Sequence, residues 1–298
     1  MDGPVIAVDR FTKYYGKTRG AEDVTFQVRP GEVFGFLGPN GAGKTTTIRG
    51  LLGLLRPTAG SIRIFNRAVS AASTDVRRRC GYLPGDFAGY AHLSAAEFIR
   101  FAARMRGADP TLPPSLLERL DLDAHTLSRR IKHLSHGTRQ KIGIVQALFH
   151  RPDLLILDEP TTGLDPLMQE TFYGLLAEAR ERGATVFFSS HILSEVEKTC
   201  DRVCIIREGH VVALEALEAL RRRRFRRLTV RLREPVDALT LPGARRTGGV
   251  GLEHHFVVEG DVEPLLAHLA RLPVADVALP EPGLEEVFMA YYRSDATE

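Results

Sequence analysis

A glycine-rich segment that ends in lysine and threonine carries the clearest chemical signal in the sequence. Gly38 to Thr45 read Gly-Pro-Asn-Gly-Ala-Gly-Lys-Thr, which fits the pattern G-x-x-x-x-G-K-[ST]. Glycines let the backbone curl so that successive N–H groups point at an anion, and the lysine adds a positive charge near the outer phosphates. The segment predicts a nucleoside triphosphate site formed by Gly38, Pro39, Asn40, Gly41, Ala42, Gly43, Lys44, Thr45 and Thr46.

Two acids that follow an apolar run support hydrolysis of that triphosphate. Residues 154–157 are Leu-Leu-Ile-Leu, and Asp158 and Glu159 come directly after them. This pattern places two carboxylates where a buried strand meets a loop. Beside a phosphate-binding loop, Asp158 is predicted to hold Mg²⁺ together with Thr45, and Glu159 to orient or deprotonate the attacking water.

The elements that position these residues alternate between strands and helices. The first 35 residues alternate apolar and polar side chains as strands do, and a helical pattern follows the glycine-rich turn. The runs 154–159 and 184–190 resemble buried strands, each preceded by a helical stretch, which indicates a parallel sheet with crossover helices. Residues 86 to about 133 look helical, and a capping box at Ser94–Glu97 predicts a helix start at Ala95.

The composition favours a globular chain of about two domains. The 298 residues are 44% hydrophobic and 26% charged, with a net charge of +3. Three cysteines, an odd number with no C-x-x-C pair, argue against a disulfide framework or structural zinc and favour a reducing compartment. No apolar run approaches the length of a membrane span, so we expect any action at a membrane to need a separate anchor.

Basic charge is concentrated in one short cluster, the sequence RRRRFRR at residues 221–227. Because nucleic-acid binding usually needs a broad basic face, no nucleic-acid partner is expected. The cluster is interpreted as a solvated linker or helix end, or else as a contact for anionic lipid or an acidic partner. The residues after it predict a small α/β module, with strands at 228–233, 255–260 and 274–279 and helices at 263–272 and 284–292.

Further motifs make the chain resemble the nucleotide-binding subunit of ABC transporters, from residue 5 to about residue 215. Tyr15 lies where that family stacks an aromatic ring on adenine. The run 134–141, Leu-Ser-His-Gly-Thr-Arg-Gln-Lys, resembles the family signature, and 162–165, Thr-Gly-Leu-Asp, resembles the D-loop. His191, after two serines, resembles the switch histidine.

The resemblance implies a fold class and domain boundaries. It implies an α/β protein with a P-loop NTPase core of ABC type: a parallel sheet with crossover helices, an N-terminal antiparallel β part and an inserted helical subdomain at about 86–150. We expect the nucleotide-binding domain to span 1–215, a basic linker 216–227, and the small α/β accessory domain 228–298.

The resemblance also implies a function. We expect an ATPase subunit that binds ATP and Mg²⁺, pairs as a homodimer or with a second nucleotide-binding domain, and drives separately encoded transmembrane permease subunits, as an exporter of drug, antibiotic or lipid. It would lie in the cytoplasm, peripheral on the cytoplasmic face of the cell membrane through its permease. The expected catalytic residues are Lys44, Glu159 and His191. The two nucleotides are expected to be bound by Tyr15, the glycine-rich loop, Ser135, Gly137 and Asp165. Of these, Ser135 and Gly137 would approach the ATP of the partner subunit.

Two other functions stay open at this point. The alternative is a soluble ABC-type ATPase of translation or DNA repair, although such proteins carry two motif sets in one chain or long heptad arms. A third reading is a scaffold that binds ATP without turnover, against which Glu159 argues.

The chain departs from the family pattern at two places. The family's Q-loop usually has Gln or Glu after Tyr-Leu-Pro, whereas Pro84 is followed here by Gly85 and Asp86. Either Asp86 substitutes, or the metal keeps an extra water and the loop serves mainly in coupling. In the signature, His136 and Thr138 replace Gly and Gln, which favours the drug and lipid exporters, and His136 is either functional or only a solvent-facing side chain.

Overall fold

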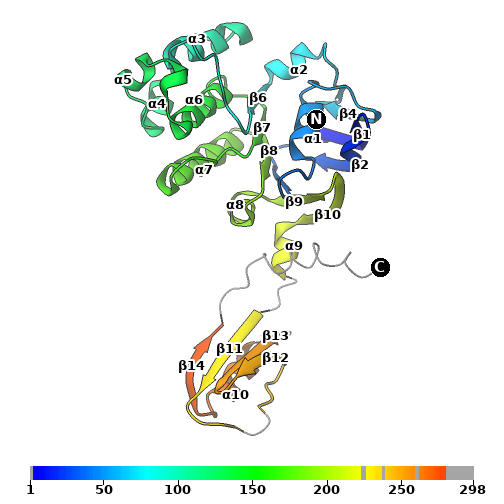
Figure 1. Ribbon diagram of the computed structural model, residues 1–298, viewed down its shortest axis with the longest axis vertical. Helices are drawn as coiled ribbons and strands as arrows, with labels where there is room; N and C mark the ends of the chain where they lie inside the picture. The colour runs from blue at the N-terminus through cyan, green and yellow to red at the C-terminus, as the bar shows by residue number, and fades with distance from the viewer. Residues whose placement is uncertain (1–2, 223–225, 237–238, 259–261, 280–298) are drawn as a thin grey trace. The chain divides into compact units, whose positions relative to one another are not determined.

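The computed structural model describes residues 3–222, 226–236, 239–258 and 262–279 of the 298. The chain divides into two compact units, Met1–Leu217 and Glu218–Glu298 (Figure 1). The first unit contains the glycine-rich loop, the two acids, the signature, the D-loop and His191.

An antiparallel sheet opens the first unit, in the order β2-β1-β4-β5. Its strands are β1 (Ile6–Tyr15), β2 (Thr18–Val28), β4 (Ala59–Ile64) and β5 (Arg67–Ala68). Ile6 and Val8 of β1 and Phe26 of β2 are buried in one core, as the alternating sequence predicts. A register shift between Val8 and Phe11 brings Phe11 into the same core.

A six-stranded sheet, ordered β10-β9-β3-β8-β7-β6, forms the centre of the first unit. The strands β3 (Val33–Leu37), β6 (Cys80–Leu83), β7 (Leu154–Asp158), β8 (Thr185–Ser190) and β9 (Arg202–Arg207) are parallel, and β10 (His210–Ala216) is an antiparallel edge strand. All residues of β3, β7 and β8 are buried, because both sheet faces are covered. The helices joined to this sheet include α1 (Lys44–Leu51), α7 (Pro166–Glu181) and α8 (Leu193–Thr199).

Short helices between β5 and β7 make up the helical part. They are α2 (Thr74–Arg78), α3 (Ala95–Arg106), α4 (Pro114–Arg119), α5 (Ala124–Ser128), the 3₁₀ turn Ile131–His133 and α6 (His136–Leu148). The capping box is present: the Ser94 side chain accepts from Glu97 N, and Glu97 accepts from Ser94 N. The predicted helix start at Ala95 is therefore confirmed.

In the described residues of the second unit, a four-stranded antiparallel sheet is accompanied by a helix between two of its strands and by another helix at the start of the unit. Its order is β12-β13-β11-β14, from β11 (Arg226–Leu232), β12 (Ala244–Val250), β13 (Glu253–Val258) and β14 (Val274–Ala278), with α10 (Val262–Leu269) between β13 and β14. Strand β12 was not predicted, and the helix predicted at 284–292 lies outside the described residues. Within the segment expected as a linker, α9 covers Leu217–Arg222 and β11 begins at Arg226.

Candidate nucleotide-binding and hydrolysis site

The glycine-rich loop runs from the end of β3 to the start of α1, so the helix N-terminus faces the loop. Two of its glycines are required sterically. A Cβ at Gly38 would lie 2.3 Å from Ile206 O, and a Cβ at Gly43 would lie 2.5 Å from Gly20 O. Gly43 also has φ +104°, which side-chain-bearing residues rarely adopt. The loop is therefore fixed in a curled form that only glycine permits at these positions.

Lys44 is buried at the centre of the loop, with 5% of its surface exposed. Its Nζ donates to Gly38 O at 2.8 Å and Pro39 O at 3.1 Å, and forms an ion pair with Glu159 Oε1 at 3.2 Å. The next residue, Thr45, donates from Oγ1 to Asp158 Oδ2 at 3.1 Å. The loop and the two acids predicted from separate motifs thus meet.

The acids lie at the carboxyl end of β7, where neighbouring strand β8 holds them. Ser189 Oγ donates to Asp158 Oδ1 at 2.6 Å, and Glu159 N donates to Ser189 O at 3.1 Å. Burial raises the pKa of the Asp158 carboxyl above its usual value. His191 Nδ1 lies 3.2 Å from Glu159 Oε2, so one carboxylate joins Lys44 to His191.

A hollow of about 270 Å³, here called the nucleotide hollow, opens over this loop. Its lining residues are Tyr15, Arg19, Gly20, Asn40, Gly41, Gly43, Lys44, Thr45, Thr46 and Glu159. Tyr15 is 47% exposed, so its ring is available for stacking at one side of the hollow. Ala42 anchors the loop to the rest of the unit, because its side chain is buried and its carbonyl oxygen accepts a hydrogen bond from Gly209 N at 2.9 Å.

A second hollow, of about 320 Å³, shares Thr45 and Glu159 with the first and contains the departure from the Q-loop pattern. A Cβ at Gly85 would lie 3.3 Å from Asp158 O and 3.6 Å from Asp158 Cγ. The glycine therefore brings the loop backbone against the acid without offering a ligand. Asp86 lines the same hollow, as do Arg49 and Tyr82.

The signature and D-loop residues lie together but line neither hollow. Ser135 is the N-cap of α6 and accepts from Thr138 N at 3.2 Å, and Asp165 is the N-cap of α7. A Cβ at Gly137 would lie 2.5 Å from Gly163 O, and one at Gly163 only 2.3 Å from the His136 ring. His136 is thus exposed but packs on the D-loop.

Sequence reasoning missed several residues of the site. Arg19 and Gly20 line the nucleotide hollow from β2, yet nothing in a strand pattern distinguishes them from other residues of that strand. Ser189 was noted only as part of the motif before His191. Its role in holding Asp158 depends on the pairing of β7 with β8, which the sequence alone does not give.

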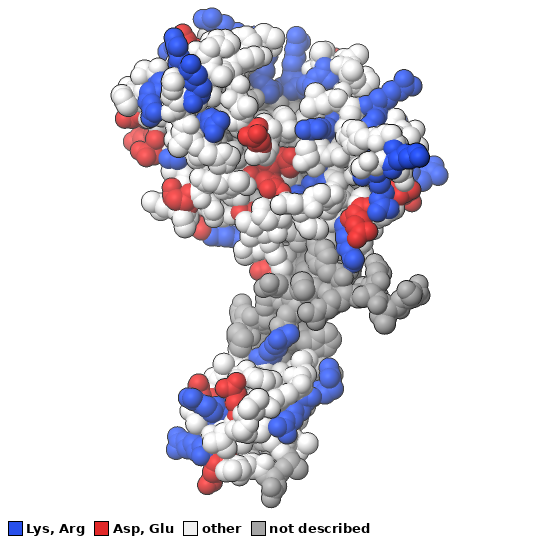
Figure 2. Space-filling model, viewed as in Figure 1, with Lys and Arg blue, Asp and Glu red and all other residues white. Residues whose placement is uncertain are grey.

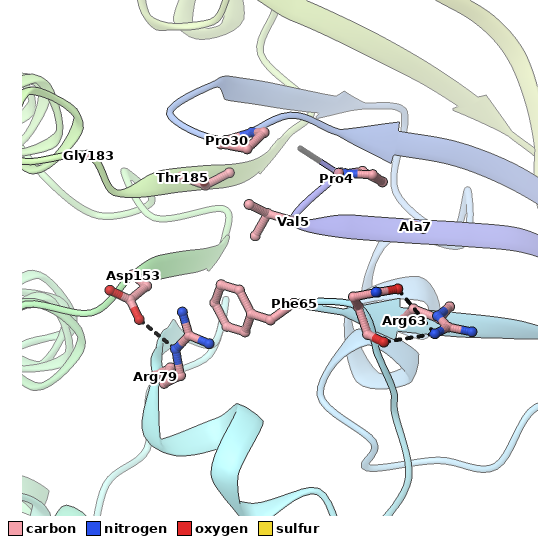
Figure 3. A pocket seen from close by; sticks show the side chains of 12 residues that line it. Pro4, Val5, Ala7, Pro30, Arg63, Phe65, Arg79, Asp153, Gly183 and Thr185 are labelled. Carbon is pink, nitrogen blue, oxygen red and sulfur yellow. Dashed lines mark hydrogen bonds and ion pairs between the residues drawn. The ribbon is translucent and has the colours of Figure 1, made fainter. Parts of the chain in front are cut away.

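The hollow drawn in Figure 3 lies at the opposite end of the same strands, with a volume of about 500 Å³. Asp153 precedes β7 and Thr185 begins β8, so this hollow lies at the amino ends of these strands. The phosphate-binding loop and the two acids lie instead at the carboxyl ends of β3 and β7. In this hollow Arg79 Nε pairs with Asp153 Oδ2 at 2.6 Å and stacks on the Phe65 ring at 3.7 Å (Figure 3). Ligands of open parallel sheets bind at the carboxyl ends of the strands, where the nucleotide hollow lies, so that hollow is the better candidate despite its smaller volume.

Comparison with known proteins decides the family. The family model described as ABC transporter matches residues 21–162. The bacitracin transport ATP-binding protein BcrA of Bacillus licheniformis is 34% identical, over 96% of this chain and 96% of its own. The chain belongs to the family of ABC transporter ATP-binding subunits. The Nod factor export ATP-binding protein I of Burkholderia orbicola (strain AU 1054) is 33% identical over 93% of both chains.

A solved structure described as an ATP-binding subunit of an ABC transporter is 36% identical to this ABC subunit. It aligns with a TM-score of 0.68 over 73% of this chain and 92% of the other. The predicted ABC-type core is confirmed, and the protein is an ATPase subunit of an ABC transporter rather than a soluble ATPase of translation or DNA repair. None of the helices in the described parts of the chain has both the length and the apolar character of a membrane span.

Proposed function

We propose that two copies of this subunit close around two ATP molecules, each held between the glycine-rich loop of one copy and the signature of the other. Ser135 and Gly137 support this arrangement because they line neither hollow of their own chain. They begin α6, whose N–H groups and positive dipole end suit a γ-phosphate from outside the chain. Asp165 caps α7 beside them and would border the same contact.

Mg²⁺ is the metal that the site fits, because a hydroxyl and a carboxylate are hard oxygen ligands. Thr45 Oγ1 and Asp158 Oδ2 lie 3.1 Å apart, and both would hold the ion. When bound, the ion neutralises charge on the outer phosphates. Ser189 would keep Asp158 oriented through its 2.6 Å hydrogen bond. In the neighbouring loop, either Asp86 would serve as a further ligand or the ion would keep an extra water.

The catalytic step would begin with an exchange of partners at Lys44. Glu159 Oε1 now lies 3.2 Å from the lysine ammonium, where the outer phosphates of ATP would bind. ATP would take the lysine and release the carboxylate toward the attacking water, with Glu159 as the base and His191 as its neighbour at 3.2 Å. Tyr15 would stack on the adenine ring.

A separate permease would dock on a groove in the helical part of the first unit, here called the arginine groove. Its walls combine the apolar side chains Tyr90, Phe98, Phe101 and Met105 with Arg77, Arg78 and Arg106. Met105 is 68% exposed and Phe101 39% exposed, so apolar surface lies open beside these arginines. Figure 2 shows Lys and Arg side chains gathered on the helical part. Such a surface suits an amphipathic helix that carries acidic residues.

The arginine groove is linked to the ATP site through strand β6 and the loop that follows it. Arg106 Nη1 donates to Cys80 O at 2.7 Å, at the start of β6, and β6 leads to Gly85 beside Asp158. A permease helix that pushes on this groove would therefore move the loop next to the acids.

The remaining proposals concern direction, location and domain boundaries. The relatives named for bacitracin transport and Nod factor export support an exporter of drug, antibiotic or lipid, with the ATPase on the cytoplasmic face of the membrane through its permease. We also propose that residues 1–215 act as the nucleotide-binding domain, 216–227 as a basic linker and 228–298 as an accessory domain.

The observation that carries the proposed mechanism is the placement of Glu159 between Lys44 and His191. Phosphate release by the purified protein with ATP and Mg²⁺ tests it, with the protein alone and with a membrane permease that co-purifies with it. Glu159→Gln should reduce turnover by about 10²-fold or more. Met105→Glu should leave basal turnover unchanged but abolish stimulation by the permease, and a stimulated Met105→Glu variant would reject the groove.

A further inference from the structure

Glu195 is a buried acid that the mechanism above does not use. It lies in the first turn of α8, which packs against β3 and β8, and only 5% of its surface is exposed. Figure 1 shows α8 close to β8. Burial of a carboxylate is costly unless strong hydrogen bonds compensate. Its partners therefore indicate why it is there.

Both carboxylate oxygens of Glu195 accept hydrogen bonds from buried hydroxyls. Ser190 Oγ donates to Oε2 at 2.6 Å, and Thr161 Oγ1 makes a short hydrogen bond to Oε1. Ser190 is 1% exposed and Thr161 is 3% exposed. Water therefore competes little for these bonds, which strengthens them.

The two hydroxyls belong to the segments that carry the proposed catalytic pair. Thr161 follows Glu159 by two residues, and Ser190 directly precedes His191. The contact of 3.2 Å between Glu159 and His191 depends on the relative position of these two segments. Glu195 joins the segments behind that contact.

The backbone of Glu159 shows why this support matters. Its φ is +47°, a left-handed conformation that costs a non-glycine residue free energy and persists only when its surroundings enforce it. Gln140 from α6 donates to Pro160 O at 2.9 Å on one side of this turn. Glu195 holds Thr161, the next residue along.

We propose that Glu195 is a positioning residue for ATP hydrolysis, which sets the geometry of Glu159 and His191 through Thr161 and Ser190. A carboxylate suits this role because it accepts from two hydroxyls at once, whereas a glutamine offers a single acceptor oxygen. The inference rests on the proposed roles of Glu159 and His191, and it makes Glu195 a residue that acts on turnover without touching ATP.

The test is steady-state ATP hydrolysis by the full-length protein carrying Glu195→Ala or Glu195→Gln. A displacement of a catalytic group by about 1 Å can lower the rate by about 10²-fold. The alanine variant, in which Glu159 and His191 lose this support, should therefore lose between ~10-fold and ~10²-fold in kcat. The glutamine variant should lose about fivefold, the worth of one hydrogen bond. KM and the Kd for ATP should stay within about twofold of the unsubstituted protein, since Lys44 and the glycine-rich loop are unchanged. Glu181→Gln, at an exposed acid that ends α7, is the matched control.

Coupling gives a second readout. Thr161→Val should lower kcat in a similar way, and the double variant with Glu195→Ala should lose little more than the worse single variant, because both remove the same bond. Fully additive losses, or kcat within twofold of wild type in the glutamine variant, would overturn the proposal. If the alanine variant fails to fold, the glutamine variant decides. Failure of the proposed mechanism itself is distinguishable, because Glu159→Gln would then retain turnover.

Discussion

Replacing Glu159 with glutamine should change ATP binding and ATP turnover in opposite directions. The glutamate has two tasks in this site: it pairs with Lys44 before ATP arrives, and it is proposed to act as the base afterwards. Glutamine keeps the shape of the side chain and removes its charge. It should therefore free Lys44 for the phosphates and at the same time abolish base catalysis.

The size of the effect on binding follows from the structure. Two unit charges 3.2 Å apart interact by about 5 kcal/mol at an effective dielectric constant near 20. Most of this is offset because the released carboxylate, which is 24% exposed in the pair, regains water, whereas the contact of ATP with Lys44 forms in both proteins and cancels. We expect a net gain of about 1.4 kcal/mol, which corresponds to about tenfold tighter ATP binding. Turnover should fall by about 10²-fold or more.

The assay is ATP titration of the purified protein over a series of protein concentrations. Tighter binding that persists at high dilution belongs to the single subunit, whereas tightening that grows with protein concentration reflects dimer formation. Glu170→Gln removes an acid from an exposed pair with Lys198 and should change neither quantity. Unchanged or weaker ATP binding by Glu159→Gln at high dilution would refute the exchange of partners at Lys44.

The other predictions concern the loop, the second unit and pH. Lys44→Ala should abolish ATP binding in calorimetry, because it removes the buried ammonium that the loop surrounds, and micromolar affinity in this variant would contradict the role of the loop. Deletion of residues 221–298 should leave ATP affinity within about twofold, because the site lies in the first unit, and loss of binding would show that the tail belongs to the core fold. Burial lowers the pKa of the His150 imidazole from 6.5 to about 4. The imidazole is therefore protonated more readily in the unfolded chain than in the folded one. Its contribution to the free energy of unfolding is present above pH 6.5 and is lost as the pH falls toward 4. Denaturant unfolding from pH 7 to pH 4.5 should show this slope, and His150→Gln should reduce it; an equal slope in both proteins would exclude His150 as its source.

Much of the nucleotide site could be predicted from the sequence because its chemistry is local. The glycine-rich loop needs consecutive residues with unusual backbone freedom, and Asp158 and Glu159 directly follow the strand that positions them. The meeting of Asp158 with Thr45 was expected because both residues are predicted to hold the same Mg²⁺ beside a phosphate-binding loop.

The contacts that reach across the fold could not be predicted in this way. Thr161 and Glu195 are 34 residues apart and meet only because α8 packs behind β8. Strand β12 has the sequence ARRTGGV, which lacks apolar alternation, and it exists because β13 pairs with it. In both cases the structure depends on a segment that is distant in the sequence or paired with it in the sheet, and the local sequence pattern does not predict that contact.

The central claim is that ATP joins two copies of this subunit, and sedimentation velocity of the Glu159→Gln variant tests it most directly. With ATP and Mg²⁺ the variant should sediment with twice the mass of one chain, and with ADP as a single chain. Ser135→Arg in the same background should prevent the dimer while leaving ATP bound, because it fills the surface expected to meet the partner's γ-phosphate. A single-chain mass at saturating ATP and Mg²⁺, with ATP demonstrably bound, would contradict the account.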